Sequence, residues 1–447
     1  MLNLNTSVLE KSDILKLYTK GYTSPVDYKI GMEYERLPIS KTSLKAVDYW
    51  DANGVNNILR DFAGENSWDY IVDGSNIVGL AKGHDTITLE PGSQIEISLK
   101  PENTISQIKN KITEINEGLY SVIADKDITL LNYGVSPYST YKTINLIPKR
   151  RYKIMAKYLW GILSDVMMRE TAGIQCCIDF KDEEDAMRKF KLANKLTPFM
   201  TAIFANSPIR GGVDTGYKSF RALSWLNTDN DRCGFVGKIS EEFSFEDYID
   251  CIMKTPMIFI LRDSQPVDID GNITFEEFMK TGYKGLMPVL EDYELQANLC
   301  FPEVRMRNFI EIRNHDCVGG DLKYSVLAIY KGIFYDKTAM EECEELLKNL
   351  QYNDYSNLRY NVPKHALQTP VKKYYVSDYA KEIIKIAEKS LKNMQTGENM
   401  YLNPIKEFTM NNVSPADVIL KKWNFFWNKD PRKLVKYLSD FENLKMC

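Results

Sequence analysis

Acidic side chains recur on three segments whose alternating pattern is typical of β-strands. Glu33 and Glu35 lie in "GMEYE", Glu90 and Glu96 flank the Pro-Gly turn of "LEPGSQIEIS", and Glu311 lies in "FIEIRNHD". Residues two apart on a strand share a face, so neighbouring strands would place these carboxylates on one face of one sheet. Clustered carboxylates repel each other unless a cation lies between them. The pattern predicts a site for Mg²⁺ or Mn²⁺, which bind through oxygen ligands.

Arginines inside or beside these segments add a second kind of chemistry. They are Arg169, Arg221 and Arg313, and the guanidinium fork suits bidentate capture of a carboxylate or a phosphate. Arginines and divalent cations around an anionic group are what phosphoryl transfer requires. Each feature alone also fits a solvated strand edge or a structural ion pair. Neither GxGxxG nor GxxxxGK[ST] occurs, so the two common phosphate-binding loops are excluded.

Other metal and nucleophile chemistries receive less support. The sequence has three histidines and eight cysteines without a CxxC pair, which argues against a zinc site or a histidine-based hydrolase. We expect scattered buried thiols rather than disulfides. The segment "PVDIDGNITFEE" resembles a calcium loop through Asp268, Asp270, Gly271 and Glu277. Pro266 occupies its first ligand position and offers no side-chain oxygen, so we expect a turn there.

Composition sets the class of protein. The 447 residues include 44% apolar and 26% charged residues, with a formal net charge of -4, which is ordinary for a soluble globular protein. This charge argues against nucleic acid or an anionic membrane surface as the main partner. No run approaches the roughly 18 apolar residues of a membrane span. The first 20 residues do not resemble a signal peptide, so we expect a cytoplasmic protein.

The elements that must position these residues follow from hydrophobic spacing. Strand character is expected in "YKIGMEYERLPI", which Pro38 should close, an antiparallel meander in the turn-rich residues 66–99, and a short strand in "AGIQCCIDF". Helical spacing is expected over residues 4–20, 103–126, 150–170 and 182–205, the last bent near Pro198. A further helix should begin at Ser414 as N-cap with Pro415 at its first position.

These elements predict an α+β fold in which a mainly antiparallel, curved sheet forms an active-site cleft surrounded by helices. No repeat, low-complexity tract or long linker marks a boundary. We therefore expect one catalytic domain over residues 1–447, with an N-terminal helical segment at 1–24 and a mainly helical part from about 320 to 447. The oligomeric state is left open.

Five blocks, in order, carry a resemblance to a known family. They are "GMEYE", "LEPGSQIEIS", "RYKIMAKYL" with "MMRETAGIQCCIDF", "LTPFMTAIFANSPIRGGVDTGYKSFRALSWLNTDNDRCG" and "FPEVRMRNFIEIRNHD". The chain resembles the plant- and proteobacterial-type glutamate–cysteine ligases, within the glutamine-synthetase-like carboxylate–amine ligases. The resemblance extends from about Gly31 to the "SPADVILKKW" helix.

This resemblance implies an ATP-dependent ligase whose small-molecule substrates are ATP, L-glutamate and L-cysteine. The γ-carboxylate of glutamate would attack ATP to give γ-glutamyl phosphate and ADP, and the cysteine amine would then expel phosphate. By the same resemblance the five glutamates named above would hold Mg²⁺ or Mn²⁺. Arg221 and Arg313 would be catalytic and also bind substrate, together with Arg169, Gln175 and Asn206.

Departures from the family pattern leave alternatives open. Gln175, Cys177 and Asp179 stand where the family has QxNxD, so Cys177 and Asp179 are uncertain metal ligands. Soft sulfur is a poor partner for Mg²⁺. Ser93 replaces a glycine of the family's EPGGQ, and Tyr293 and Gln296 replace a tryptophan and a histidine. The same chemistry with another amine, a catalytically silent nucleotide-binding relative, and a metal-dependent hydrolase therefore remain as alternatives.

Overall fold

The computed structural model describes residues 9–237, 242–269 and 273–439. At its centre lies a nine-stranded sheet in the order β14-β15-β7-β1-β5-β4-β3-β2, with β6 pairing the far end of β1. All its pairings are antiparallel, which confirms the predicted α+β class. The strands are β1 (Ile30–Ser40), β2 (Asp69–Asp73), β3 (Asn76–Lys82), β4 (Asp85–Leu89), β5 (Ile95–Ser98), β6 (Ile128–Leu131), β7 (Gly173–Ile178), β14 (Val304–Met306) and β15 (Ile310–Asp316).

Strand β1 runs further than its sequence predicts. Pro38 was expected to close it, yet the strand continues to Ser40. Residues Glu33–Arg36 pair with β5, whereas Leu37–Ser40 pair with β6. The strand can continue through Pro38 because β1 changes its partner there from β5 to β6. Proline has no N–H to donate, and such a residue is tolerated where the ladder of hydrogen bonds is interrupted.

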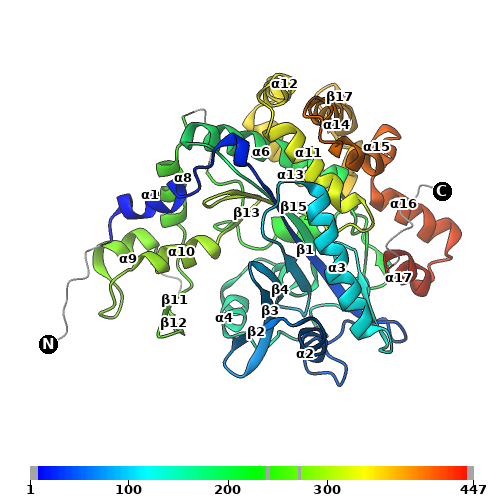
Figure 1. The fold of residues 1–447 in the computed structure, drawn as a ribbon, viewed down its shortest axis with the longest axis horizontal. Helices are drawn as coiled ribbons and strands as arrows, with labels where there is room; N and C mark the ends of the chain where they lie inside the picture. Colours follow the sequence, from blue (N-terminus) through cyan, green and yellow to red (C-terminus); the bar gives the residue numbers. More distant parts are fainter. Residues whose placement is uncertain (1–8, 238–241, 270–272, 440–447) are drawn as a thin grey trace.

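Helices cover the sheet (Figure 1). Helices α6 and α11 contact β15 and β7 respectively, and α14 packs on α11. After β15 the described chain is helical apart from short turns and the β16–β17 hairpin. The helices are α2 (Val55–Asn66), α3 (Ile105–Ile123), α4 (Arg150–Tyr158), α5 (Ser164–Glu170), α6 (Glu183–Ile203), α7 (Phe220–Leu226), α11 (Leu322–Phe334), α12 (Lys337–Leu347), α13 (Tyr352–His365), α14 (Val376–Asn393), α15 (Asn403–Met410), α16 (Pro415–Lys421) and α17 (Pro431–Ser439).

Helix α3 forms where its spacing predicts it. Thr104 precedes the helix, and its hydroxyl accepts a hydrogen bond from the Gln107 N–H at 3.3 Å. Such a cap satisfies a backbone donor that the first turn leaves unpaired. The apolar positions of the helix, Ile105, Ile108, Ile112, Ile115 and Leu119, are all buried. Ser414 and Pro415 likewise begin α16 as predicted.

The expected continuous helix over residues 150–170 is wrong. Two helices, α4 and α5, are separated by residues 159–163. Gly161 lies in this break, and a Cβ added to it would come within 1.8 Å of the Thr228 carbonyl oxygen. The chain approaches its neighbour closely here, which only glycine permits. Tyr152 and Met155 of α4 line the cavity that also contains Glu33, Glu35, Glu90 and Glu96, called the main cavity below.

A second group of elements lies beside the N-terminal helix, at the left of Figure 1. Helix α1 covers Lys11–Thr19, a shorter span than expected, and residues 4–8 of the prediction lie outside the described residues. Asp270 and Gly271 of the calcium-like segment also lie outside them. The group contains α8 (Phe245–Met253), β11 (Phe259–Arg262), β12 (Gln265–Asp268), α9 (Phe275–Thr281) and α10 (Leu290–Asn298).

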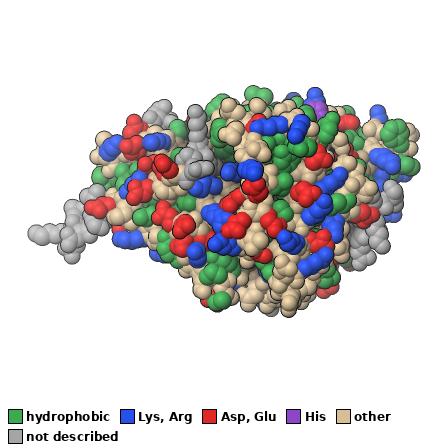
Figure 2. Space-filling model, turned by 90° about the horizontal axis from the view of Figure 1, so that it is seen from above, with side chains coloured by type: hydrophobic (Ala, Val, Ile, Leu, Met, Phe, Trp, Pro, Cys, Tyr) green, Lys and Arg blue, Asp and Glu red, His purple; other side chains and the backbone are tan. Residues whose placement is uncertain are grey.

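Short pairings complete the described chain. They are β8 (Ile209–Arg210) with β9 (Val213–Asp214), β10 (Cys233–Gly234) with β13 (Phe301–Pro302), and β16 (Pro370–Val371) with β17 (Tyr374–Tyr375). The seven described cysteines are all free thiols, five of them buried, as predicted, and Cys447 lies outside the described residues. No helix in the described ranges is both long and apolar enough to cross a membrane. Figure 2 shows acidic and basic side chains interspersed over one face.

Candidate active site

Four of the five predicted glutamates meet at one cavity. Glu33 and Glu35 from β1, Glu96 from β5 and Glu90 from the turn before β5 all line a cavity of about 300 Å³. Helices α4 and α10 contribute the wall that faces the sheet. The turn folds back because the Glu90 N–H donates to the Gln94 carbonyl at 2.9 Å. Distant segments therefore come together as the alternation predicted.

Strand register explains why these carboxylates share a face. Glu35 lies directly opposite Glu96 on β5, and Glu33 lies opposite Gln175 on β7. Directly opposite residues of antiparallel strands project to the same side of a sheet. None of the four cavity-lining glutamates forms an ion pair with a Lys or Arg of the described chain. Glu96 instead accepts hydrogen bonds from the hydroxyls of Thr88 (2.8 Å) and Ser98 (3.2 Å).

Burial and the charges of neighbouring acids disfavour ionisation of Glu33, Glu35 and Glu96. Burial raises the pKa of Glu33 to about 7, and the nearby negative charge of Glu311 adds to this. Burial also raises the pKa of Glu96 well above its ordinary value, with Glu33 and Glu90 contributing. The pKa of Glu35 is raised as well, mainly by burial. A cation in this cavity would relieve the repulsion.

Arginines form the neighbouring part of the cavity wall. Arg305, Arg307 and Arg313 all line it, and all three surround the buried Glu311. Arg305 binds the Glu311 carboxylate with two hydrogen bonds of 3.0 and 2.9 Å, and Arg313 pairs with the same carboxylate. Burial opposes ionisation of Glu311, but Arg305 and Arg313 outweigh it and lower its pKa to about 2. Glu311 therefore anchors the arginines and does not itself line the cavity.

A chain of hydrogen bonds links the acids to the arginines across the sheet. The Glu35 carboxylate accepts from the Gly173 N–H at 2.6 Å and from Gln175 Nε2 at 3.3 Å. Gln175 Oε1 accepts from Arg313 Nη1 at 2.5 Å. Gln175 thus spans from an acid to an arginine, and its amide orientation is fixed because Nε2 donates and Oε1 accepts.

Arg221 is buried beside β7. Its guanidinium donates to the Arg313 carbonyl at 3.0 Å. A Cβ added to Gly173 would lie 2.4 Å from Arg221 Nη2. Glycine at this strand position therefore allows the guanidinium to rest against the sheet. Arg221 lines a smaller pocket that shares Arg313 with the main cavity.

Besides Glu311, four of the predicted site residues lie outside both pockets. Arg169 donates to the carbonyls of Tyr141 and Ile144, both at 3.2 Å, and pairs with Asp165. Asn206 donates to the carbonyls of Asn132 and Cys317. In the structure, then, Arg169 and Asn206 contact the protein's own backbone rather than the cavity.

Asp179 and Cys177 take similar positions away from the cavity. The Asp179 carboxylate accepts from the Lys29 N–H at 2.7 Å, at the far end of β7. Cys177 lies between Gly31 and Glu311 in the sheet register. Burial raises the pKa of its thiol well above the ordinary value, and Glu33 adds to the shift. A neutral thiol that fills space in the sheet fits this position.

The other departures from the family pattern are structural. The Tyr293 hydroxyl is buried and lies 2.7 Å from that of Tyr18. Gln296 is buried and donates to the Thr255 carbonyl at 2.9 Å. Ser93 is buried and has φ +73°, a conformation that favours glycine. None of these three lines the cavity that holds the four glutamates.

Sequence reasoning missed several cavity residues. Arg151, Tyr152, Arg305 and Arg307 line the cavity but were not predicted as site residues. The spacing of Arg305 and Arg307 around the short strand β14 was a usable signal, because residues two apart on a strand point the same way. Arg151 lies in a helix whose orientation depends on the break at Gly161, so its sequence gave no comparable signal.

The fit to a divalent cation can be judged from the residues present. The four cavity-lining carboxylates offer hard oxygen donors without an ion-pair partner in the described ranges, which suits Mg²⁺ or Mn²⁺. As they stand, no three His, Cys, Asp or Glu groups in the described part of the chain are close enough to hold a metal ion. Binding would therefore require side-chain rotations around the cavity.

Solved structures share this architecture. A glutamate–cysteine ligase from Francisella tularensis, in complex with AMP, aligns with a TM-score of 0.57 at 13% identity, covering 92% of this chain and 88% of that one. A bifunctional glutathione synthetase from Pasteurella multocida aligns with a TM-score of 0.54 at 10% identity, covering 96% of this chain and 53% of that one. The chain thus has the fold of this class of ligases.

Sequence comparison identifies the family. The profile of glutamate–cysteine ligase family 2 (GCS2) matches residues 29–435. The chloroplastic glutamate–cysteine ligase B of Oryza sativa subsp. japonica is 32% identical over 435 residues, covering 95% of this chain and 86% of that protein. The chloroplastic enzyme of Arabidopsis thaliana is 31% identical over 435 residues, covering 95% and 82%. The chain belongs to glutamate–cysteine ligase family 2, as its motifs predicted.

Proposed function

We propose that this protein is an ATP-dependent ligase that joins the γ-carboxylate of glutamate to the amine of cysteine. The observation that carries the proposal is a cavity lined by four glutamates that form no ion pair with a described Lys or Arg, beside a cluster of arginines. The family match of the chain covers residues 29–435. The reaction requires two anions, a carboxylate and a nucleotide phosphate, to approach each other. Preorganised cations lower the cost of that approach.

The arginines supply fixed positive charge. Arg305 and Arg313 are held by Glu311 and Gln175, so they are oriented before substrate arrives. Such preorganised donors stabilise charge that develops on a phosphoryl group. Arg313 lines both pockets. It is therefore the candidate for contact with both the phosphoryl group of the nucleotide and the γ-carboxylate of glutamate. Gln175 acts as a positioning residue through Arg313.

We propose further that Glu33, Glu35, Glu90 and Glu96 hold Mg²⁺ or Mn²⁺. The support is their shared cavity and the lack of a Lys or Arg ion-pair partner for them among the residues that the structure describes. A bound divalent ion would neutralise the phosphate oxygens of the nucleotide and orient them for transfer. The nucleotide would be ATP; the Francisella relative, similar in fold, was solved in complex with AMP.

A coupled assay for ADP release tests this function. ATP, Mg²⁺ and L-glutamate are supplied, and L-cysteine or another amine is added in turn. We expect ADP release with cysteine, and γ-glutamylcysteine as the product by mass spectrometry. ADP release with a different amine only would assign another acceptor. Nucleotide binding without turnover would indicate a silent relative, and substrate hydrolysis without nucleotide would indicate a hydrolase.

We propose a reducing compartment, such as the cytoplasm, for this protein. The support is the set of seven described cysteines, all free, since oxidising compartments favour disulfides. Fractionation of cells that express the tagged protein would test this, and recovery in an oxidising compartment would contradict it.

A further inference from the structure

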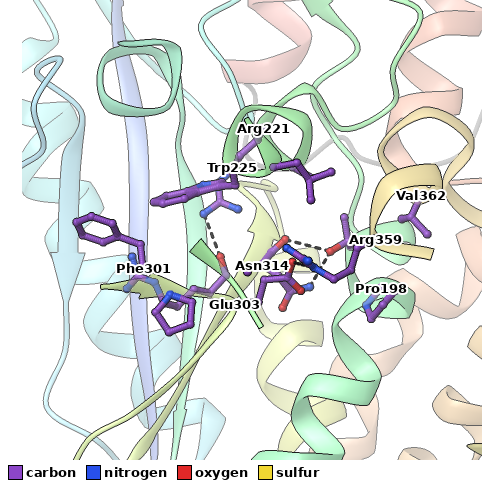
Figure 3. A pocket seen from close by; sticks show the side chains of 14 residues that line it. Pro198, Arg221, Trp225, Phe301, Glu303, Asn314, Arg359 and Val362 are labelled. Carbon is purple, nitrogen blue, oxygen red and sulfur yellow. Dashed lines mark hydrogen bonds and ion pairs between the residues drawn. The ribbon is translucent and has the colours of Figure 1, made fainter. Parts of the chain in front are cut away.

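A separate cavity, called the back pocket below, lies between α3, the start of α11 and the start of α15. It has a volume of about 740 Å³, which accommodates a small organic molecule. The back pocket shares no lining residue with the main cavity or with the smaller pocket drawn in Figure 3. It is therefore a site distinct from the one described above.

Strand alternation places the back pocket across the sheet from the acids. Glu33 and Glu35 line the main cavity. Tyr34 and Arg36 alternate with them along β1, so they project to the other face. Arg36 is fully buried there and donates to the side chain of Asn116, which lines the back pocket. A ligand in the back pocket therefore lies on the opposite side of β1 from the acids that we propose to hold the metal.

The wall of the back pocket contains a buried amide with an unused donor. Asn116 is only 7% exposed. Its Oδ1 accepts from Arg36 Nη1 at 2.7 Å, and a flipped amide would set two N–H donors against each other, so Nδ2 is the remaining atom. Among the described residues, no group accepts a hydrogen bond from Asn116 Nδ2. Buried polar groups are almost always paired, so this donor points to an acceptor that a ligand supplies.

Positive charge faces the same pocket. Lys323 lines it, is 3% exposed, and donates through Nζ to the Gly320 carbonyl at 2.7 Å. Burial lowers the pKa of Lys323 to about 7, and the nearby charge of Arg36 adds to the shift. Lys109 also lines the pocket and pairs with Asp321 at 2.8 Å. A negative charge beside Lys323 would offset its burial and the repulsion from Arg36, so the pocket favours an anionic ligand.

Two helices begin at the back pocket without a side-chain cap. Helix α11 begins at Leu322 and α15 at Asn403, and the residue before each helix makes no side-chain cap bond. Leu322 and Asn403 both line the pocket. The N–H groups of a first helical turn carry partial positive charge and favour an anion. The acids Glu117 and Glu407 also line the pocket but are exposed, so solvent screens their charge.

We infer that the back pocket binds a small organic phosphate. The phosphate oxygens accept from Asn116 Nδ2 and from Lys323 near the first turn of α11, and the organic part packs on the rings of Tyr324 and Pro404. A phosphate group fits better than a carboxylate, because its larger charge and its three oxygens match a lysine, an amide donor and two helix starts. The ligand takes no part in the ligase chemistry, and the inference does not rest on the proposed function.

Pyridoxal 5′-phosphate is a probe for this pocket. Its phosphate and ring match the inferred ligand, and its aldehyde condenses with a neutral lysine amine to give an imine and water. Borohydride then delivers hydride to the imine carbon, and peptide mass mapping locates the resulting secondary amine. In the full-length protein at pH 7.5 we expect Lys323 to be labelled at least about 10-fold more than the exposed Lys337. Equal labelling of the two lysines would overturn the inference.

Two comparisons in the wild-type protein isolate the phosphate group. Pyridoxal, which lacks the phosphate, should label Lys323 about 10-fold less than pyridoxal 5′-phosphate at the same concentration. Phenyl phosphate should protect Lys323 from labelling, whereas benzoate, with a carboxylate on the same ring, should protect it about 10-fold less well. Equal labelling by the two aldehydes would overturn the inference. Better protection by benzoate would overturn it in favour of a carboxylate ligand.

The Asn116→Asp variant keeps the acceptor for Arg36 and replaces the unused donor by an acceptor. We expect the ratio of labelling by pyridoxal 5′-phosphate to labelling by pyridoxal at Lys323 to fall from about 10 to about 1. The ratio is the readout because a changed pKa of Lys323 affects both reactions alike. Asn349→Asp makes the same change at an exposed position and should keep the wild-type ratio. An unchanged ratio in Asn116→Asp would contradict the proposed contact, and the wild-type comparisons hold even if this variant does not fold.

Discussion

Glu35 and Glu96 lie directly opposite each other on strands β1 and β5, and both carboxylates face the same cavity. Among the described residues, Glu96 has two hydroxyl donors, Thr88 and Ser98, to offset its burial. Two acids on directly opposite strand positions, with no Lys or Arg partner in the described part of the chain, destabilise the ligand-free protein, because each disfavours ionisation of the other. The arrangement is therefore best explained by the cation that we propose they bind.

Replacing Glu96 tests this role. Glu96→Gln keeps the shape and removes the charge, so we expect kcat to fall by about 100-fold or more. Without metal, the unfolding midpoint of the Glu96→Gln protein should equal or exceed that of the wild type, because the repulsion between Glu96 and the neighbouring glutamates is removed. Glu114→Gln, at an exposed position of α3, is the matched control. A near-normal kcat for Glu96→Gln would remove Glu96 from the metal site.

The raised pKa of Glu33 predicts a pH-dependent stability. Its ordinary pKa is 4.5, and burial with the nearby Glu311 raises it to about 7 in the folded protein. Between these values the unfolded chain releases the proton that the folded chain keeps, so the free energy of unfolding should fall as pH rises through this window.

Urea unfolding in EDTA at pH 5 and at pH 7.5 measures this effect. Glu33→Gln does not titrate, so its stability relative to the wild type should increase from pH 5 to pH 7.5. A constant difference between the two proteins at both pH values would contradict the raised pKa.

Gly173 should be required for the position of Arg221. In Gly173→Ala the new methyl group would overlap the Arg221 guanidinium, which is flexible enough to move away. We expect a drop of about 10-fold or more in kcat/KM, with a loss of stability of roughly 1 kcal/mol. Gly64→Ala is the control, because its Cβ would meet nothing within 4 Å. It lies inside α2 and should stabilise by about 0.5–1 kcal/mol. Wild-type kinetics for Gly173→Ala would show that Arg221 need not lie against β7.

Ser93 should be strained by its backbone conformation. A φ of +73° costs a non-glycine residue about 1–2 kcal/mol. We expect Ser93→Gly to raise the free energy of unfolding by about 1 kcal/mol, as measured by urea denaturation, and to leave kcat unchanged. A destabilised Ser93→Gly protein would indicate that the buried hydroxyl forms a bond that outweighs the strain.

The sequence by itself determined the strands and the acids they carry. Alternation in "GMEYE" and "QIEIS" fixes which side chains share a face, because the strand period is two, and the ordered motifs were sufficient to identify the family. The same local signals located α3 and α16, since N-caps and apolar spacing act within a few residues.

Only the tertiary structure decided which charged groups line the cavity. In the sequence, Glu311 resembles Glu96 as an acid on an alternating strand, yet in the structure it pairs with three arginines. Arg169 was predicted beside Arg313 as a substrate-binding arginine, yet it donates to backbone carbonyls. Partner choice depends on strand order and on close approaches such as Gly173 with Arg221. The contact between Gly173 and Arg221 joins residues far apart in the chain, so no local pattern encodes it.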